Sequence, residues 1–599
     1  MENVKKENFP TTFYISQLEK LAKEHTKYSQ KSKLWVLIRL STFIGIALLF
    51  YFSFPYNILS TLSIIASIVL FLFFVRKSAE NKEHLNYLKQ LIAFNENEIK
   101  ASQHDFSAFP DGAAYIQPDH PFSYDMDVFG NRSFFQLFNR TVTIKGERKL
   151  AERLLNGVKD PIESAKAIDE LTTHKEWYQG FLAHGKSLEK EETDVSIVQV
   201  VNEDFSSKSW IKFARIIIPI LAISLTTAMY FDIVSGIQFI VIAAILMLPT
   251  RQTLKTTNSL HSSLSKIGKR ANAMSKQLLL IEEKSFSSNL LKRYHEELFT
   301  ENSNAKQGLK ELSLLVKEAE YRDNVIVAVF LNFFFAWDFR LLLKIKTWQE
   351  KYALQAERWE EIVYDFEGLI SGANFRVNFQ EHTSTPILTS ADDLEISLVN
   401  LGHPIIPLSK LVKNSFSLNG QEQFAIITGP NMAGKSTFLR SIGINLMLAK
   451  AGFHVMAEKF TFPDMQLYSS MRTSDDLKDE TSYFHAELLR LRFIMDAIEN
   501  GEKVFIILDE ILKGTNSKDK EEGSSKFLQK LNKLNVKGII ATHDLSLTDL
   551  ANEYPSIVNR YFDTDIKGDE ISFDYCIHNG VAKNMNASFL LRKMGLIDN

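Results

Sequence analysis

The chain has 599 residues and a mass of 68.6 kDa, which predicts three or four domains rather than one. Hydrophobic residues make up 45% and charged residues 24%, a balance that excludes a disordered or collagen-like chain. A formal net charge of −3 excludes a polycationic nucleic-acid binder, although local basic faces remain open. The single cysteine, Cys576, excludes a disulfide framework and any metal site built from several cysteines, so the soluble parts are expected in a reducing compartment.

Two pairs of apolar runs predict two hairpins that cross a membrane. A bilayer core needs about 20 apolar residues per helix, with a range of about 17–25. The second run of the first pair meets this length, and the first run does so if Trp35–Ile38 are added and Arg39 reaches the headgroups. Buried hairpins of a soluble protein are the alternative. The four runs are Leu40–Phe54, Ile58–Val75, Ile216–Phe231 and Ile233–Pro249.

Lysine and arginine flank both pairs, whereas the short connections Pro55–Asn57 and Asp232 carry none. By the positive-inside rule, both hairpins then reach outward and the large segments stay in the cytoplasm. The sequence predicts a multi-pass protein of the cell membrane. No cleavable signal peptide is expected, because Met1–Lys33 is polar. The flanking residues are Lys31, Lys33, Arg76, Lys77, Lys208, Lys212, Arg215, Arg251 and Lys255.

Composition along the chain predicts six consecutive parts. Gln252–Gly368 has no proline and few glycines, so long helices are expected there. The apolar stretch Val325–Trp337 is short for a fifth span, which is kept as an alternative. From Asn374 onward, β-branched runs alternate with helical ones, as in an α/β domain. The parts are a cytoplasmic segment (1–33), hairpin 1 (34–75), a first helical core part (76–214), hairpin 2 (215–250), a second helical core or lever part (251–373) and an α/β domain (374–599).

The sharpest motif is a G-x-x-x-x-G-K-[ST] loop, which in this chain runs from a strand into a helix. Phe424–Thr428 precedes it as a strand run, and Phe438–Lys450 continues helically. Glycines let backbone N–H groups approach phosphates at a helix N-terminus. Lys435 would reach the β- and γ-phosphates of ATP, and the Ser436 hydroxyl would bind Mg²⁺. The loop consists of Gly429, Pro430, Asn431, Met432, Ala433, Gly434, Lys435, Ser436 and Thr437.

Two further strand runs end in residues suited to the same chemistry. Val504–Leu508 ends in Asp509, a ligand for Mg²⁺, and Glu510, which would orient or deprotonate the attacking water. Gly538–Thr542 ends in His543, which could hydrogen-bond a γ-phosphate. Together these strand ends predict a C-terminal α/β P-loop ATPase domain of the ABC type, following an all-α core that carries the two hairpins.

Ser482 lies between the first two sites and has N-cap chemistry for a following helix. The apolar positions of that helix are Phe484, Leu488, Leu491, Met495 and Ile498. A helix N-terminus with a serine and free N–H groups is another anion site. An ordinary helix cap is the alternative.

These motifs resemble those of the MutS family of DNA mismatch-repair ATPases. "TGPNMAGKST" at Thr428–Thr437 is close to the family's nucleotide loop, and "ILDEILKGTNS" at Ile507–Ser517 resembles its second nucleotide motif. "ATHD" at Ala541–Asp544 resembles its histidine loop, and "LGHPII" at Leu401–Ile406 its entry into the ATPase domain. "TSYFHAEL" at Thr481–Leu488 is similar to the segment that completes the partner subunit's ATP site. Asn579–Leu596 resembles the terminal helical segment used in dimer contact, and Phe134–Leu155 resembles, more weakly, the start of the helical core domain.

The resemblance implies a homodimer that binds and hydrolyses ATP at its interface. Each ATP would lie between one subunit's phosphate loop and the other subunit's Ser482 segment, with Asn431 assisting at the phosphates. Leu411 and Val412 fall where family members hold the adenine. ATP binding would close the dimer and hydrolysis would reopen it.

The chain also departs from the family pattern. It shows no separate N-terminal domain that reads mismatches, and the Phe-x-Glu echoes at Phe94–Glu96 and Phe379–Glu381 lie in the wrong context. No nuclease-like extension is expected after Asn599, and the hairpins are foreign to soluble members. Mismatch specificity therefore does not carry over, and DNA remains a candidate partner. Lys266, Lys269, Arg270 and Lys276 could form a phosphate-binding helix face or a solvated face near anionic lipid.

The leading hypothesis is a membrane-anchored, dimeric MutS-like ATPase that uses Mg²⁺ and couples turnover to DNA binding. One alternative is a nucleotide-gated membrane scaffold that binds protein partners without DNA. Another is an ABC-like transporter. The missing L-S-G-G-Q signature before Val504 argues against it, as does the lack in the apolar runs of polar groups that would line a transport path.

Overall fold

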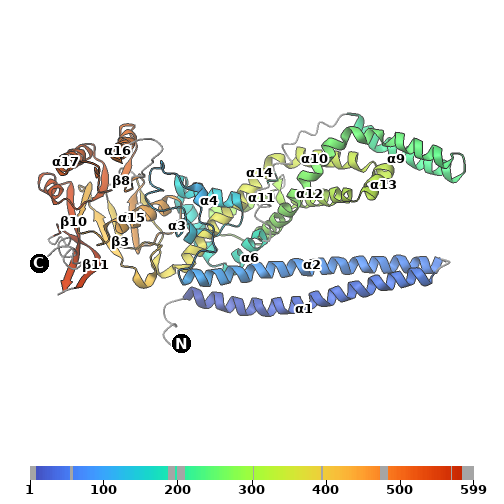
Figure 1. The fold of residues 1–599 in the computed structure, drawn as a ribbon, viewed down its shortest axis with the longest axis horizontal. Coiled ribbons are helices and arrows are strands. Elements are labelled where there is room, and N and C mark those ends of the chain that lie inside the picture. The colour runs from blue at the N-terminus through green and yellow to red at the C-terminus, as the bar shows by residue number, and fades with distance from the viewer. Residues whose placement is uncertain are drawn as a thin grey trace. The chain divides into compact units, whose positions relative to one another are not determined.

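The computed structural model describes residues 9–53, 58–186, 196–197, 209–300, 303–390, 392, 395–472, 483–567 and 570–582, which group into two compact units (Figure 1). Unit 1 takes its described residues from 1–102, 141–146 and 174–367. Unit 2 takes its described residues from 103–140, 147–173 and 368–599. Residues 103–140 and 147–173, expected within a helical core, thus group with the C-terminal α/β part.

The described residues of unit 1 are almost entirely helical, and the long helices predicted over 252–368 from the absence of proline are confirmed there. A two-residue strand, β1 (Ser303–Asn304), and a single 3₁₀ turn, η2 (Tyr321–Asp323), interrupt the helices. Helices α4 (Ile144–Asn156) and α14 (Trp337–Asn378) contribute residues to both units. The other helices of unit 1 are α1 (Phe9–Phe52), α2 (Ile58–Ser102), α6 (Lys175–Lys186), α9 (Ser209–Tyr230), α10 (Gly236–Glu282), α11 (Asn289–Phe299), α12 (Ala305–Glu320) and α13 (Val325–Phe335).

The four predicted apolar runs all lie in helices, and three of these helices extend well past the apolar residues. Helices α1 and α2 have 44 and 45 residues and lie side by side, while α9 and α10 form a second pair (Figure 1). In each of α1, α2 and α10, a polar stretch continues the same helix without a break. By length and composition alone, four helices in the described part of the chain could cross a membrane.

The apolar stretch after Asn324 forms a short helix that packs beside α9 and α10. Helix α13 has 11 residues and is therefore about 16 Å long, well short of a bilayer core of about 30 Å. It ends at Ala336, whose φ of 48° turns the chain by 81° into α14. Phe333 of α13 is buried with Ala222 and Leu225 of α9. Helix α13 alone is thus too short to cross a membrane.

One basic residue of the predicted helix face is in the core of unit 1. Arg270 of α10 is fully buried, and its guanidinium lies over the ring of Tyr364 at 5.5 Å from the centroid. The prediction that Arg270 shares an exposed face with Lys266 and Lys269 is therefore wrong. Arg270 stands three residues after Ile267 and four before Met274, both buried, and so lies on the buried stripe of the helix.

Unit 2 combines two sheets with surrounding helices. The six-stranded sheet has the order β11-β10-β5-β9-β8-β7, parallel except for β11, and the four-stranded sheet has the order β2-β6-β3-β4. The strands are β2 (Ile387–Thr389), β3 (Ile396–Leu401), β4 (Asn414–Leu418), β5 (Phe424–Thr428), β6 (Lys459–Pro463), β7 (Gln466–Ser470), β8 (Val504–Asp509), β9 (Lys537–Ala541), β10 (Ile557–Lys567) and β11 (Glu570–Asn579). The helices are α3 (Phe134–Phe138), α5 (Pro161–Thr172), α15 (Lys435–Lys450), α16 (Tyr483–Glu499), α17 (Ser517–Lys533) and α18 (Leu550–Glu553), with 3₁₀ turns η1 (Ala113–Tyr115), η3 (Gln380–His382), η4 (Leu408–Lys410) and η5 (Leu545–Asp549).

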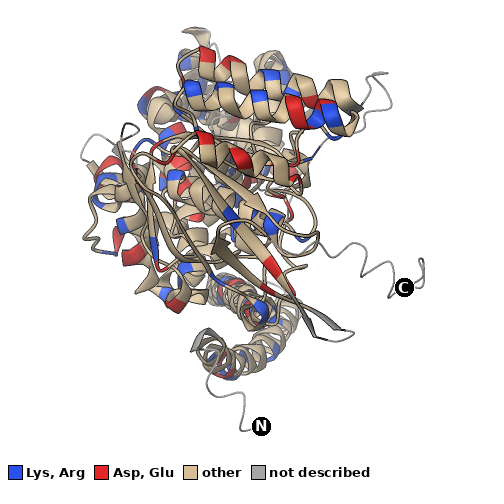
Figure 2. Cartoon of the chain, turned by 90° about the vertical axis from the view of Figure 1, so that its left-hand side faces the viewer, with Lys and Arg blue, Asp and Glu red and all other residues tan. Residues whose placement is uncertain are grey.

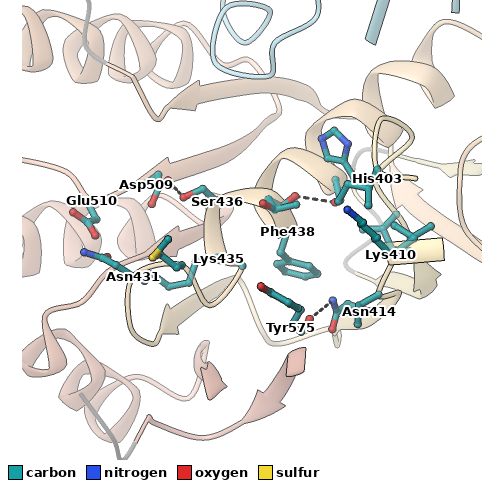
Figure 3. Close-up of a pocket in the computed structure, with 18 of the residues that line it drawn as sticks. His403, Lys410, Asn414, Asn431, Lys435, Ser436, Phe438, Asp509, Glu510 and Tyr575 are labelled. Atoms are coloured by element: carbon teal, nitrogen blue, oxygen red, sulfur yellow. Dashed lines mark hydrogen bonds between the residues drawn. The ribbon is translucent and has the colours of Figure 1, made fainter. Parts of the chain in front are cut away.

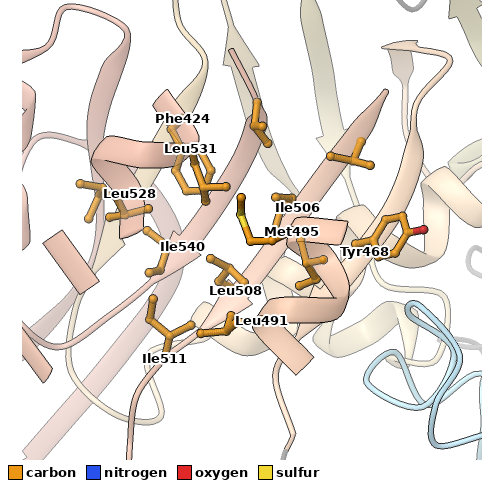
Figure 4. Packing of buried hydrophobic residues seen from close by; sticks show 14 of the residues in the cluster. Phe424, Tyr468, Leu491, Met495, Ile506, Leu508, Ile511, Leu528, Leu531 and Ile540 are labelled. Atoms are coloured by element: carbon orange, nitrogen blue, oxygen red, sulfur yellow. The ribbon is translucent and has the colours of Figure 1, made fainter. Parts of the chain in front are cut away.

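The three predicted strand runs form the centre of the parallel sheet. Every residue of β5 and β9 is buried, as is β8 up to Leu508, which explains their unbroken apolar character. Figure 4 shows Leu491 and Met495 of α16 packed against Ile506 and Leu508 of β8. The predicted apolar face of α16 holds at Leu491 and Met495. Leu488, which was predicted to lie on this face, is 40% exposed. Ile494, which was not among the predicted positions, is fully buried.

Ion pairs and hydrogen bonds attach residues 119–127 to the end of β7. The Asp125 carboxylate accepts hydrogen bonds from the Ser469 hydroxyl and the backbone N–H groups of Met471 and Arg472. Asp127 binds the Arg472 guanidinium with both oxygens, at 2.5 and 2.8 Å, and lies 3.1 Å from Arg440 of α15. These charged contacts explain why a segment distant in sequence belongs to unit 2.

Candidate functional site

The carboxyl ends of three parallel strands bring the predicted site residues to one edge of the sheet. Strand β9 lies between β5 and β8, with Ile427 opposite Ala541 and Asp509 also opposite Ala541. The phosphate loop follows β5, Glu510 follows β8 and His543 follows β9. In open α/β sheets, ligands bind at this edge of the strands.

A cavity of about 750 Å³ opens at this edge (Figure 3). This volume is in the range of small-molecule sites. Loop residues Asn431, Met432, Gly434, Lys435, Ser436 and Thr437 line it, as do the predicted residues Leu411, Val412, Asp509 and Glu510. Its other lining residues are Leu401, His403, Ile406, Lys410, Asn414, Phe438, Ser441, Lys513 and Tyr575.

The loop backbone is shaped by glycine at the point where the chain leaves β5. Gly429 has a φ of 142°, and a Cβ there would lie 2.6 Å from the carbonyl oxygen of Phe562. The Lys435 ammonium donates hydrogen bonds to the carbonyl oxygens of Gly429 at 2.7 Å and Pro430 at 2.9 Å. Burial lowers the pKa of Lys435, against the opposing effect of the Glu510 and Asp509 carboxylates. Ala433 is fully buried beneath the loop.

Ser436 and Asp509 form an oxygen pair at the start of α15. The Ser436 hydroxyl donates a hydrogen bond of 2.5 Å to Asp509 Oδ2, and burial raises the pKa of Asp509. Mg²⁺ prefers oxygen ligands and is usually held by one or two carboxylates together with substrate phosphates. Among the described residues, no group of three or more His, Cys, Asp or Glu side chains is arranged to hold a metal. The pair therefore fits an ion that also takes ligands from a bound phosphate.

Glu510 and His543 form a second pair beside the cavity. The Glu510 carboxylate lies 2.9 Å from His543 Nδ1, and its backbone has a left-handed φ of 56°. Burial raises the pKa of Glu510, but the hydrogen bond from His543 and the charges of His543, Lys513 and Lys435 outweigh it, so the pKa is lowered. Glu510 is thus held ionised at the cavity wall, and His543 acts on it rather than lining the cavity.

The far end of the cavity contains residues that the sequence did not indicate. Tyr575 of β11 lines this end together with Leu411, Val412 and Phe438. The Asn414 amide donates to the Tyr575 carbonyl at 2.9 Å and accepts from the Ile577 N–H at 2.8 Å (Figure 3). This bridge between β4 and β11 positions Tyr575, whose φ is 56°. No local motif marks Tyr575, because its place depends on the pairing of β11 with β10.

His403, which lies in the Leu401–Ile406 motif without a role predicted for it, is a buried histidine in the cavity wall. Its Nδ1 accepts a hydrogen bond from the Ile405 N–H at 3.3 Å. Burial lowers its pKa to about 4, helped by the Arg440 charge and opposed by Asp127. The folded state therefore binds fewer protons than the unfolded state between the two pKa values, and stability falls as pH falls through this window.

Replacing His403 with Asn is expected to flatten the acid dependence of unfolding. Asn keeps an acceptor for the Ile405 N–H but does not titrate. Between about pH 7 and about pH 5, the wild type should lose about 2 kcal/mol more stability than the variant. Thermal or denaturant unfolding of both proteins across this range measures the difference. Parallel losses in the two proteins would contradict the assigned pKa.

Two predicted segments lie outside the described residues. Ser482 is one, and the C-terminal dimer-contact segment is described only up to Ala582. Helix α16, for which Ser482 was the predicted cap, begins at Tyr483. The roles assigned to these segments stay predictions.

Comparison with known proteins gives matches to a single family, each covering part of the chain. Residues 425–592 match the family model described as MutS domain V. The DNA mismatch repair protein MutS of Thermotoga sp. strain RQ2 is 31% identical over 196 residues, 32% of this chain and 24% of that protein. The MutS of Persephonella marina is 31% identical over 211 residues, 34% of this chain and 24% of that protein. DNA mismatch repair protein MSH4 of Arabidopsis thaliana is 29% identical over 214 residues, 35% of this chain and 26% of that protein.

The matched part therefore spans about a quarter of the length of these relatives. The stretch that matches MutS domain V, residues 425–592, contains the phosphate loop that begins at Gly429, the strand end at Asp509–Glu510 and His543. A helical region followed by an α/β unit with a mixed sheet fits this family. Over residues 425–592, this chain is therefore similar to MutS domain V.

Proposed function

We propose that this chain is a membrane-anchored ATPase that binds and hydrolyses ATP, with Mg²⁺, at an interface between two copies. The convergence of Lys435, the Ser436–Asp509 pair and the Glu510–His543 pair around one cavity is the observation that carries this proposal. Homodimer formation is inferred from the likeness to the MutS family, in which Ser482 would complete the site of the partner copy.

Lys435 and the loop backbone would hold the triphosphate. The buried ammonium of Lys435 now donates to two loop carbonyls and can turn these N–H donors to phosphate oxygens. Asn431 lies beside them at the cavity wall. Ser436 and Asp509 would hold Mg²⁺, which supplies positive charge at the β- and γ-phosphates.

Glu510 would position and deprotonate the attacking water. Its lowered pKa keeps the carboxylate ionised near neutral pH, the form that can accept a hydrogen bond from the attacking water. The hydrogen bond from His543 fixes the orientation of Glu510, so that one oxygen remains directed to the cavity. Because His543 contacts Glu510, it is assigned as a positioning residue for the general base.

Tyr575 is expected to strengthen nucleotide binding by stacking on the adenine. Tyr575 lines the same cavity as the apolar residues Leu411 and Val412. Tyr575→Ala should weaken ATP binding about tenfold, because stacking of a base on an aromatic ring contributes about 1–3 kcal/mol. The KM for ATP should rise while kcat changes little, and Tyr575→Phe should restore the KM. An unchanged KM in Tyr575→Ala would contradict the stacking role.

The exposure of the apolar helices supports membrane anchoring. In α1 and α2, none of the most apolar 18-residue stretch is buried, and in α9 and α10 only 28% and 11% are buried. Water-exposed apolar patches of this extent are rare in soluble monomers. The alternative of buried soluble hairpins would require these residues to be covered. We therefore assign α1, α2, α9 and α10 as spans, with the α/β unit in the cytoplasm.

The single cysteine offers a test of this orientation. Cys576 lies on β11 in unit 2 and is partly exposed, and burial raises the pKa of its thiol. A membrane-impermeant maleimide at mildly alkaline pH should label Cys576 only after cells are broken. The protein should also stay in the membrane fraction after alkaline carbonate extraction. Labelling in intact cells would contradict the orientation, and release by carbonate would contradict the spans.

Coupling of ATP turnover to DNA has a specific alternative, a scaffold that binds protein partners without DNA. On the side of the chain seen in Figure 2, Lys and Arg residues are interspersed with Asp and Glu residues. This mixture, with a net charge of −3, favours the scaffold that binds protein partners without DNA. ATP turnover should be measured with and without duplex, mismatched and branched DNA at two salt concentrations. Stimulation that falls with salt supports DNA coupling, and no response supports the scaffold.

A further inference from the structure

A basic recess lies where α9 and α14 pack together in unit 1. Its volume is about 390 Å³. Its α14 residues are three or four positions apart and therefore share one helix face. The recess presents three cations, one hydroxyl group and two aliphatic side chains. Its lining residues are Arg215 and Ile216 of α9 and Arg340, Leu343, Lys344 and Thr347 of α14.

Apolar contacts hold the two walls of this recess together. Ile211 and Ile218 of α9 are buried in one cluster with Phe339 of α14 and with Ala336, which directly precedes α14. Arg215 stands four residues after Ile211 and three before Ile218, so it projects from the face of α9 that meets α14. The recess is therefore a built feature of this helix pair and not a chance gap between mobile side chains.

Two of the three cations lack an anionic partner. Within the described part of the chain, no ion pair or side-chain hydrogen bond is found for Arg215 or Arg340. Lys344 instead lies 2.6 and 2.8 Å from the carboxylate oxygens of Glu318. Guanidinium groups bind phosphate oxygens through paired N–H donors, so the recess is suited to a phosphate group.

The recess lies where the surface of α9 changes from polar to apolar. Directly after Arg215, Ile216, Ile217 and Ile220 are 54%, 50% and 57% exposed. Trp210, one turn before Arg215, packs edge-on against Phe339 at 5.4 Å between ring centroids. Tryptophan and basic residues at the start of an apolar run are typical of the headgroup layer of a membrane.

We propose that this recess binds the phosphate of an anionic phospholipid headgroup, an inference that rests on the proposed membrane anchoring. Arg215 and Arg340 hold the phosphate oxygens, with Lys344 beside them. The acyl chains continue along the exposed apolar surface of α9 that begins at Ile216. Basic pockets between membrane helices on the cytoplasmic side bind such headgroups by this chemistry.

Lipid retention by the full-length protein tests this assignment. The protein is placed in nanodiscs of mixed phosphatidylcholine and phosphatidylglycerol, and the lipids it retains are identified by native mass spectrometry. Wild type should retain phosphatidylglycerol in preference. Arg215→Gln with Arg340→Gln should weaken this retention about 10- to 30-fold. The matched control is Lys212→Gln with Lys346→Gln, which removes the same charge from the same two helices outside the recess and should behave as wild type.

The other outcomes of this experiment either overturn the proposal or identify a different source of the phosphate. Equal retention in the recess variant and the wild type overturns the proposal, as does an equal loss in the matched control. If inorganic phosphate displaces the lipid from the wild type at comparable affinity, the ligand is a soluble phosphate and the lipid assignment is wrong. Flotation with vesicles tests the lipid site and the membrane anchoring separately. A protein that floats without lipid preference refutes only the lipid site in the recess. A protein that does not float refutes the anchoring as well.

Discussion

Glu510→Gln is expected to leave ATP binding intact and to slow turnover by about 10²- to 10⁴-fold, the usual contribution of a general base. The amide keeps the size and the hydrogen-bonding reach of the carboxylate toward His543 but cannot accept the proton of the attacking water. Steady-state phosphate release and equilibrium binding of a fluorescent ATP analogue measure the two effects separately.

Glu521→Gln is the matched control for this experiment. Glu521 is exposed on α17, away from the cavity, and its replacement removes the same charge from the same unit. The control should match the wild type in both assays. Hydrolysis that continues at the wild-type rate in Glu510→Gln would refute the assigned role, and a loss of binding would show that Glu510 holds the nucleotide instead.

Lys435→Ala should weaken ATP binding by about 30-fold or more, because truncating one member of a buried charge pair costs about 2–5 kcal/mol. Lys435 is only 6% exposed and is the cation of the phosphate loop. Lys518→Ala, at an exposed position on α17, removes the same charge without touching the cavity. Binding titrations with and without Mg²⁺ compare the three proteins, and thermal unfolding checks that the variant folds. Equal affinity in Lys435→Ala and the wild type would contradict the phosphate site.

The phosphate half of the site could be predicted because each residue lies next to its own structural signal. Gly429, Asp509 and His543 each follow a short run of apolar residues that can only be a buried strand. Parallel pairing then brings the three ends together without any further information. Prediction of this half required only strand runs and the polar residues that end them.

The other half of the cavity depends on contacts that no local pattern contains. Tyr575 reaches the site through the pairing of β11 with β10 and through the Asn414 bridge. His403 lies in the Leu401–Ile406 motif, but its burial and the charges of Arg440 and Asp127 that act on its pKa are not contained in that motif. Such positions are set by tertiary packing, which secondary-structure propensities and sequence motifs do not predict.

In unit 1, too, some features could be predicted from the sequence and others could not. Apolar composition identified the runs within α1, α2, α9 and α10, whereas the end of α13 at Ala336 carries neither glycine nor proline and could not be placed. The prediction that Arg270 is exposed was wrong because it relied on the nearby basic residues and not on the position of Arg270 around the helix. Its positions relative to Ile267 and Met274 already mark the buried stripe.

Imaging the full-length protein in nanodiscs by electron cryo-microscopy, with a non-hydrolysable ATP analogue and Mg²⁺, tests the central claim most directly. The account predicts density for a triphosphate against the loop at Lys435 and for an ion between Ser436 and Asp509, with a second copy closing the cavity. A single copy whose cavity stays empty at saturating nucleotide would contradict it.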